Sequence, residues 1–211
     1  MARLVASEPS VPVQYRTPGR SRRSVLLGAA ALAVAGGSAS AWLVWRTALP
    51  KRFAVVSEGV LYRSAQPTPR QIDNAVRRCA IRTLLIVREG DSSRVEREIA
   101  HAAAAGLRVV HLPVSSGGEI SDDQVARFWR TIDDPANHPV LIHCAAGRHR
   151  TGFFCALYRV ARQGWSPEQA RDEMLSFGFD RQRHATLLAQ FERVLQTGPA
   201  GADRPRPAWT R

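Results

Sequence analysis

Residues 140–152 constrain the fold of this chain more than any other stretch. They read Val-Leu-Ile-His-Cys-Ala-Ala-Gly-Arg-His-Arg-Thr-Gly, and residues 153–163, which follow, are rich in helix formers. An apolar run, a loop of small and basic residues and an amphipathic segment are typical of a buried strand, a tight turn and a helix. The sequence therefore predicts a strand-loop-helix unit with Cys144 at the end of the strand.

The loop after this strand is suited to holding an anion. Gly147 can adopt a positive φ, so successive backbone N–H groups can point inward, and the helix that follows adds its positive dipole end. Arg150 supplies a planar fork that fits two phosphate oxygens. In that field the thiol of Cys144 is expected to lose its proton well below the usual pKa of about 8.5. The residues expected to bind the substrate are Ala145, Ala146, Gly147, Arg148 and His149.

The loop also matches a known family pattern. His143, Cys144, Gly147, Arg150, Thr151 and Gly152 fill every fixed position of His-Cys-x-x-Gly-x-x-Arg-Thr/Ser-Gly. In this the chain resembles the cysteine-dependent protein tyrosine and dual-specificity phosphatases. Residues 61–67, 87–88 and 165–167 are similar to bacterial members of the atypical dual-specificity group, so the resemblance covers about residues 55–195. Residues 147–152 are similar to the loop of plant and fungal atypical members, some of which remove phosphate from inositol pyrophosphates.

This resemblance implies a phosphatase with a phosphocysteine intermediate. Cys144 would attack phosphorus, Arg150 and the loop amides would hold the equatorial oxygens, and Thr151 would donate its hydroxyl to the departing sulfur. His143 is expected to orient the loop by hydrogen bonding. The substrate would be a phosphorylated protein or an inositol phosphate, and we expect no cofactor.

The general acid is less well specified. Relatives supply this acid from an Asp on the loop that follows the strand before the one that ends in the catalytic cysteine. Here that loop, residues 113–123, lacks a Trp-Pro-Asp and offers Glu119, Asp122 and Asp123. Asp122 and Asp123 fall in the first turn of an expected helix, where acids are favoured in any case. Asp122 and Glu119 are equal candidates, and Asp123 is the third.

Three alternatives are open. A rhodanese-like sulfurtransferase also uses a loop cysteine, although the pair Arg150-Thr151 favours phosphate. A membrane-tethered phosphate-binding module with little turnover would result if no carboxylate reaches the site. Arg148 and His149 are either solvated side chains or contacts to a highly anionic substrate, which would favour an inositol polyphosphate over phosphotyrosine.

The N-terminal region is expected to lie outside the catalytic domain. Residues 1–24 are basic and rich in Pro and Ser, which predicts disorder. Residues 25–45 carry no charge and would span about 31 Å as a helix, which suits a single transmembrane or signal-anchor helix. Residues 21–26 resemble a twin-arginine export signal, and residues 39–41 resemble a signal-peptidase site. The sequence thus predicts a single-pass membrane protein with an extracytoplasmic, periplasmic catalytic domain; the cytoplasmic face is the alternative.

Strand and helix signals alternate through residues 53–197. Strands are expected near residues 53–56 and 60–63, which form a small hairpin around a turn at 57–59, and near residues 82–87, 107–112 and 140–144. Helices are expected at 69–79, 93–105, 121–132, 153–163, from 166 onward, and at 181–196. Alternation of this kind predicts an α/β fold with a mostly parallel central sheet and helices on both faces. Residues 198–211 are predicted to be a disordered tail.

Charge and cysteine content exclude other classes. The net charge is +12, but residues 1–52 and 198–211 carry most of it and leave +3 for residues 53–197, so we expect no nucleic-acid partner. Cys79, Cys144 and Cys155 have no spacing suited to zinc, so we expect no metal and no disulfide framework. Cys79 and Cys155 are interpreted as small buried hydrophobes, with a resolving role for Cys155 as the alternative.

Overall fold

The computed structural model describes residues 48–90 and 93–197. The strands are β1 (Ala54–Ser57), β2 (Leu61–Ala65), β3 (Thr83–Ile86), β4 (Arg108–His111) and β5 (Val140–Cys144). The helices are α2 (Pro69–Cys79), α3 (Ser93–Ala104), α4 (Asp122–Asp133), the short η1 (Pro135–Asn137), α5 (His149–Gln163), α6 (Pro167–Ser176) and α7 (Ala185–Thr197). The predicted alternation of strands and helices is confirmed.

The strands form one five-stranded sheet in the order β1-β2-β5-β3-β4. β1 pairs antiparallel with β2, whereas β2 with β5, β5 with β3, and β3 with β4 are parallel. The sheet is therefore mixed, with a single antiparallel strand at one edge. β5 lies in the middle and is paired along its length on both sides.

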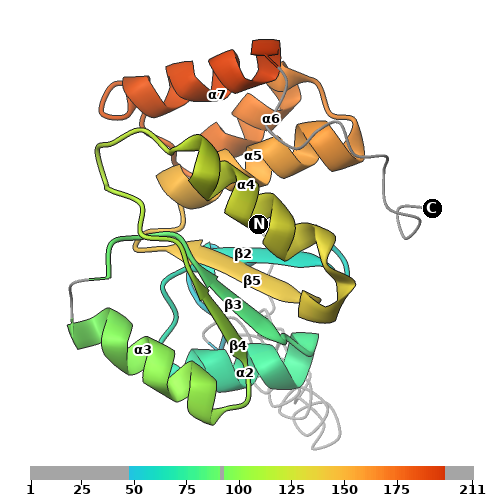
Figure 1. The fold of residues 1–211 in the computed structure, drawn as a ribbon, viewed down its shortest axis with the longest axis vertical. Coiled ribbons are helices and arrows are strands. Elements are labelled where there is room, and N and C mark those ends of the chain that lie inside the picture. The colour runs from blue at the N-terminus through green and yellow to red at the C-terminus, as the bar shows by residue number, and fades with distance from the viewer. Residues whose placement is uncertain (1–47, 91–92, 198–211) are drawn as a thin grey trace, which may run out of the picture. The chain divides into compact units, whose positions relative to one another are not determined.

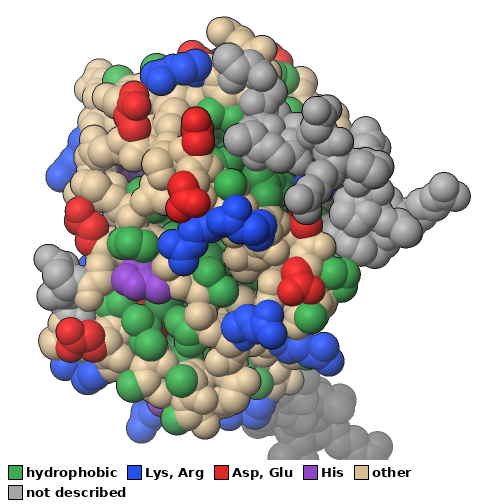
Figure 2. Space-filling view, in the orientation of Figure 1, with side chains coloured by type: hydrophobic (Ala, Val, Ile, Leu, Met, Phe, Trp, Pro, Cys, Tyr) green, Lys and Arg blue, Asp and Glu red, His purple; other side chains and the backbone are tan. Residues whose placement is uncertain are grey.

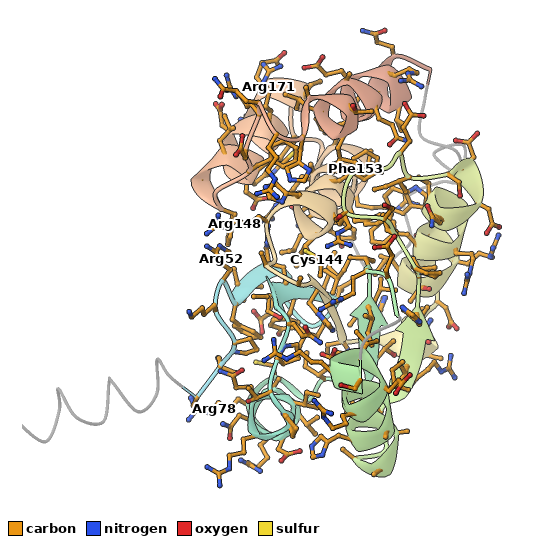
Figure 3. The ribbon with its side chains drawn as sticks, turned by 90° about the vertical axis from the view of Figure 1, so that its left-hand side faces the viewer. Arg52, Arg78, Cys144, Arg148, Phe153 and Arg171 are labelled. Atoms are coloured by element: carbon orange, nitrogen blue, oxygen red, sulfur yellow. The ribbon has the colours of Figure 1, made fainter. Side chains whose placement is uncertain are left out.

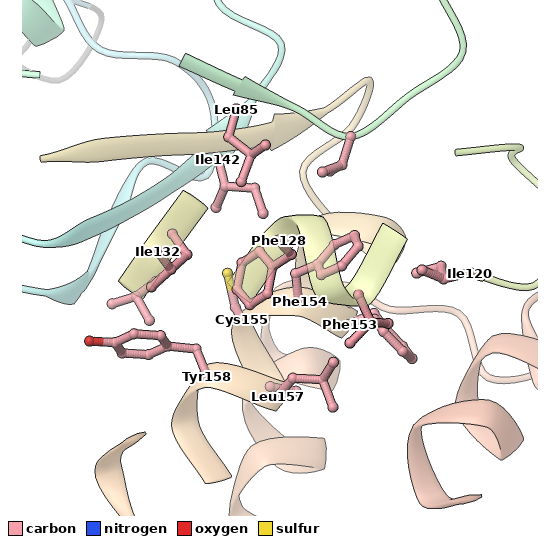
Figure 4. Packing of buried hydrophobic residues seen from close by; sticks show 14 of the residues in the cluster. Leu85, Ile120, Phe128, Ile132, Ile142, Phe153, Phe154, Cys155, Leu157 and Tyr158 are labelled. Atoms are coloured by element: carbon pink, nitrogen blue, oxygen red, sulfur yellow. The ribbon is translucent and has the colours of Figure 1, made fainter. Parts of the chain in front are cut away.

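Helices cover both faces of the sheet (Figure 1), with α2 and α3 on one side and α4, α5, α6 and α7 on the other. Alternate side chains of each strand face opposite layers, so Ile142 and Leu85 join the core under α4 and α5, while Leu141 and Leu84 join the core under α2 and α3. Phe128 and Phe154 pack at 4.8 Å between ring centroids in the larger layer (Figure 4).

Capping residues determine where three helices begin. Thr68, Ser121 and Ser166 each form a capping box with the Gln three residues later, as the sequence predicts. Pro at the first position of α2 and α6 adds a fixed φ where no N–H partner is needed. These helices are therefore specified locally.

Two helices begin four residues away from the predicted start. α5 begins at His149, so Arg150, Thr151 and Gly152 lie in its first turn and not in the loop before it. α7 begins at Ala185, because the Asp180 carboxylate accepts the N–H groups of Gln182 and Arg183 and holds residues 181–184 in turns.

The predicted membrane localisation is corrected. Among residues 48–90 and 93–197 no helix is long and apolar enough to cross a membrane. The longest described helix, α5, has 15 residues, and a membrane-spanning helix needs about 20 apolar ones. The transmembrane or signal-anchor helix predicted for residues 25–45 lies outside the described residues, as do the disordered segments predicted for residues 1–24 and 198–211. Within the described residues the structure therefore does not support the predicted single-pass membrane localisation, with either a periplasmic or a cytoplasmic catalytic domain.

Basic and acidic side chains are interspersed on the face seen in Figure 2, without a continuous patch of one sign. This distribution agrees with the modest net charge of residues 53–197.

Candidate active site

The candidate site lies at the carboxyl end of β5. Cys144 is the last residue of this strand and is paired with Ala65 of β2, while the preceding residue, His143, is paired with Ile86 of β3. Cys144 is only 2% exposed. The end of a central parallel strand is where α/β sheets bind ligands, and the pairing on both sides fixes the sulfur in place.

Gly147 allows the loop to turn tightly over the end of β2. Its φ is +67°, and a Cβ at this position would lie 2.5 Å from the Ser64 carbonyl oxygen and 2.6 Å from the Ala65 nitrogen. The Gly147 N–H points to the Cys144 Sγ at 3.2 Å. Only glycine combines this backbone conformation with such close packing against backbone atoms.

The loop carbonyls are held on the side away from the sulfur. The Gln66 N–H donates to the Ala145 carbonyl at 3.2 Å. Arg52 Nη1 donates to the Ala146 carbonyl and Arg63 Nη2 donates to the Gly147 carbonyl, each at 3.1 Å. In a trans peptide the N–H points opposite to the C=O, so donors behind the loop turn the amides of residues 146–148 toward the anion site.

The environment of Cys144 stabilises its thiolate. Burial by itself raises the pKa of this thiol, but the hydroxyl and N–H of Thr151, the charge of Arg150 and the N–H of Gly147 together lower the pKa below its ordinary value. The Thr151 hydroxyl is fully buried and has no oxygen or nitrogen partner in the described part of the chain. The acceptor for this hydroxyl is therefore the thiolate of Cys144.

Arg150 reaches across to the loop that follows β4. Its Nη1 donates to the Val114 carbonyl at 2.7 Å, which fixes the guanidinium beside a pocket of 380 Å³. The pocket is lined by Ser116, Gly117, His149, Arg150, Arg183 and His184. Cationic and imidazole groups dominate this lining, so the pocket suits a ligand with more than one negative charge.

His149 and His184 stack on each other beside this pocket. Their ring centroids are 3.7 Å apart, and the rings of His149 and Phe179 meet edge to face with centroids 5.2 Å apart. Burial, the neighbouring His184 ring and the charge of Arg148 lower the pKa of His149 to about 4, and burial together with the charge of Arg183 lowers the pKa of His184. Both rings are therefore neutral hydrogen-bonding groups at neutral pH.

A buried polar chain supports the loop from the α3 side. His143 is fully buried; its Nδ1 lies 3.3 Å from the Cys144 carbonyl oxygen and its Nε2 lies 3.1 Å from Glu98 Oε1. Glu98 accepts from Gln66 Nε2 at 2.7 Å, and Gln66 accepts from Arg88. These contacts fit the orienting role expected of His143.

The carboxylates expected as general acids are not among the residues that line this pocket. Glu119 is exposed and pairs with Arg193 of α7 at 3.3 Å. Asp122 and Asp123 are exposed in the first turn of α4, where Asp123 pairs with Arg130 at 3.6 Å. The structure thus brings together Cys144 and the loop residues, while Glu119 lies on the loop that follows β4 and Asp122 is the first residue of α4.

We expect Gly147→Ala to inactivate the site and to destabilise the fold by about 1–3 kcal/mol, because its new methyl group would meet the backbone of β2. Gly106→Ala is the matched control: Gly106 also has a positive φ of +78°, but nothing lies within 4 Å of the position of its Cβ. Thermal melts and turnover of p-nitrophenyl phosphate separate the two variants. Equal losses in both would show that backbone strain alone, and not the contact with β2, matters.

A buried thiol with stabilised charge, loop amides turned toward it and an adjacent guanidinium define the class of cysteine-dependent phosphatases. The chain belongs to the tyrosine phosphatase family, whose model matches residues 48–203. The resemblance found in the loop sequence is thereby confirmed.

Curated relatives carry two kinds of name. The chain is 33% identical over 120 residues to the dual specificity protein phosphatase TpbA of Pseudomonas aeruginosa strain UCBPP-PA14, covering 56% of this chain and 51% of the relative. It is 31% identical over 144 residues to the inositol diphosphatase DSP1 of Oryza sativa subsp. japonica, covering 65% of this chain and 62% of the relative. The chain spans about half the length of the TpbA relative.

Solved structures agree with this fold. The core catalytic domain of the PP-IP phosphatase SIW14 from S. cerevisiae, in complex with citrate, matches with a TM-score of 0.58 at 22% identity, covering 72% of this chain and 96% of that one. The P. aeruginosa TpbA structure matches with a TM-score of 0.52 at 30% identity, covering 64% and 80%.

Several residues at the site were not predicted from the sequence: Arg52, Arg63, Glu98, Arg183 and His184. Glu98 carried a usable signal, since it falls on the same helix face as the buried Val95 and Ala102, where an acid needs a buried partner. Arg63 lies in a strand whose residues are all buried, which also marks a partnered charge. The contacts of Arg52 reach residues 94 and 125 positions away and leave no local pattern.

Proposed function

We propose that this chain is a cysteine-dependent phosphatase that hydrolyses phosphate monoesters through a phosphocysteine intermediate. The observation that carries the proposal is the Cys144 sulfur, buried at the end of β5 and facing the Gly147 N–H, with Thr151 and Arg150 lowering its pKa. A charged nucleophile beside fixed anion-binding donors is the requirement of this chemistry.

The reaction proceeds in two displacements at phosphorus. The Cys144 thiolate attacks in line, so that an S–P bond forms while the P–O bond to the leaving group breaks and that oxygen takes the electron pair. Arg150 and the N–H groups of residues 145–149 hold the three equatorial oxygens. Water then attacks phosphorus and gives up a proton to the solvent, the electron pair of the S–P bond returns to the sulfur as that bond breaks, and inorganic phosphate is released. The Thr151 hydroxyl donates to the departing sulfur.

The surroundings of the pocket favour a substrate with several phosphate groups. Arg150, Arg183, His149 and His184 offer more donors than one phosphoryl group can use, and Arg148 lies close to Gly178 at the same end of the fold. In a diphosphate the bond that breaks is a phosphoanhydride bond and not a monoester bond, and its leaving group is a phosphate, which departs without the proton that an alkoxide needs. Relatives named inositol diphosphatases support this substrate class, and the relative named a dual specificity protein phosphatase supports a phosphoprotein.

The other functions considered from the sequence are less well supported. A sulfurtransferase would have no use for an arginine fork and a threonine hydroxyl at the sulfur, and the curated relatives are named phosphatases. Thiosulfate-to-cyanide transfer by the purified chain would reverse this judgement. A phosphate-binding module without turnover would bind tungstate but release no phosphate from any substrate.

A substrate screen with the full chain tests the proposal. Release of phosphate from phosphopeptides, inositol phosphates and inositol pyrophosphates is measured side by side with the Cys144→Ser variant. We expect release that depends on Cys144, with the highest kcat/KM for the most highly phosphorylated substrates. Turnover that survives in the variant would reject the proposed chemistry.

We propose Asp122 as the general acid for substrates with a poor leaving group, in preference to Glu119, which is already paired with Arg193. Asp122→Asn is expected to lower turnover of phenyl phosphate by about a hundredfold and that of p-nitrophenyl phosphate by only a few fold, because nitrophenolate leaves without a proton. Steady-state kinetics of both substrates provide the measurement.

The control for this experiment is Asp172→Asn, which removes an exposed carboxylate from α6. Glu119→Gln is measured in parallel. A loss confined to phenyl phosphate in Glu119→Gln, with Asp122→Asn unaffected, would transfer the role to Glu119.

A further inference from the structure

Arg52 approaches the anion-binding loop from a turn ahead of β1. The Phe53 N–H donates to the Pro50 carbonyl at 3.1 Å and closes this turn, and the Lys51 carbonyl accepts the Ala65 N–H at 2.8 Å. Ala65 is the residue paired with Cys144. The turn is therefore fixed to the strand end that lies next to the nucleophile.

The backbone of Arg52 is in an unusual conformation. Its φ is +57°, in the left-handed region that residues with a side chain rarely adopt. Such a conformation persists only where the surrounding contacts hold it, and it is enriched at functional sites. Here the contacts on either side of Arg52, through Lys51 and Phe53, hold the backbone in place.

The guanidinium of Arg52 bridges two segments. Nη1 donates to the Ala146 carbonyl and Nε donates to the Phe177 carbonyl, both at 3.1 Å. The Ala146 carbonyl and the Gly147 N–H belong to the same peptide unit, so they point in opposite directions. Holding this carbonyl therefore aims the Gly147 N–H at the Cys144 sulfur, where it is found at 3.2 Å.

The positive charge of Arg52 also interacts with the thiolate of Cys144. Burial and the charges of Arg148 and Arg63 lower the pKa of Arg52, while the Cys144 thiolate raises it. Arg52 and Arg148 lie near each other at the level of Cys144 in Figure 3. Three guanidinium groups near one another repel, and the repulsion is relieved when an anion occupies the loop in front of them.

We propose that Arg52 is a positioning residue of this site: by holding the Ala146 carbonyl it directs the Gly147 N–H toward the sulfur and toward a bound oxyanion. Arg52 does not touch the substrate in this proposal. Its part in turnover rests on the proposed phosphatase function, whereas its effect on the thiol and on oxyanion binding does not.

The test compares Arg52→Ala and Arg52→Lys with the full-length parent chain. The pH dependence of Cys144 alkylation by iodoacetamide is followed by mass spectrometry of the peptide that contains it, and tungstate affinity is measured by calorimetry. We expect Arg52→Ala to move the alkylation midpoint to higher pH and to weaken tungstate binding by about tenfold. Both values for Arg52→Lys should fall between those of the parent chain and those of Arg52→Ala, because an ammonium keeps the charge but cannot reach both carbonyls.

Arg82→Ala is the matched control, because Arg82 is exposed just before β3, at the end of the strands opposite to Cys144. It should leave both measurements unchanged. A folded Arg52→Ala chain with parental alkylation and tungstate affinity would overturn the proposal. If that variant does not fold, parental values in Arg52→Lys would overturn it equally. A parent chain that binds tungstate but releases no phosphate from any substrate would refute the phosphatase function and leave this inference intact.

Discussion

Cys144→Ser is expected to lower the turnover of p-nitrophenyl phosphate by about a thousandfold or more. A serine hydroxyl keeps its proton at neutral pH, so the donors around the sulfur would have no anion to stabilise. The oxygen is smaller than sulfur and fits the same buried position, so the variant should fold and still bind tungstate. Activity assays together with thermal melts make the comparison.

The pH dependence of the parent chain belongs to the same prediction. Because the pKa of Cys144 is lowered, the thiolate persists below the ordinary pKa of a thiol, and kcat/KM should fall only as the pH drops through the lowered value. Since the pKa of His149 is about 4, no further change from this ring is expected near pH 6.5. Cys79→Ser, at a half-buried cysteine of α2, serves as the control and should retain activity. Full activity in Cys144→Ser would contradict the nucleophilic role.

Arg150→Lys is expected to reduce kcat/KM by about a hundredfold with little loss of stability. A lysine keeps the charge but offers no fork for two phosphate oxygens, and it loses the bond to the Val114 carbonyl that orients the guanidinium. The loss should appear in kcat as well as in KM, because the equatorial oxygens gain charge in the transition state.

Arg181→Lys is the corresponding control, since Arg181 is exposed and does not line the pocket. Steady-state kinetics on p-nitrophenyl phosphate suffice for both variants. Equal activity of Arg150→Lys and the parent would mean that any cation serves here, and the proposed bidentate contact would have to be abandoned.

Short sequence patterns correctly predicted three helix starts and the central strand, because interactions between neighbouring residues determine them. The capping boxes at Thr68, Ser121 and Ser166 gave correct helix starts, and the apolar run ending in Cys144 gave the central strand. The start of α5 was placed too late, because Arg148, with no side-chain cap, precedes the helix and carries no capping signal. The antiparallel pair of β1 and β2 is the hairpin expected from the sequence, and it makes the otherwise parallel sheet mixed.

Contacts between distant segments could not be predicted in the same way. Arg52 and Arg63 bind loop carbonyls 94 and 84 residues away, and the stacking of His184 on His149 depends on how α7 packs against α5. These contacts depend on how the helices and strands are arranged in space, so no residue spacing in the sequence indicates them. The signature residues were recognisable because they are adjacent in the chain; the groups that support them are not.

The nucleophile and the residues that line the pocket are carried by different parts of the fold. Its end carries the sulfur and is braced by a neighbouring strand on each side, whereas Arg183 and His184 belong to a surface turn just before α7. Exchanging residues 181–184 should therefore change the substrate specificity and leave the catalytic residues unchanged. The chain offers a scaffold in which selectivity can be engineered separately from chemistry.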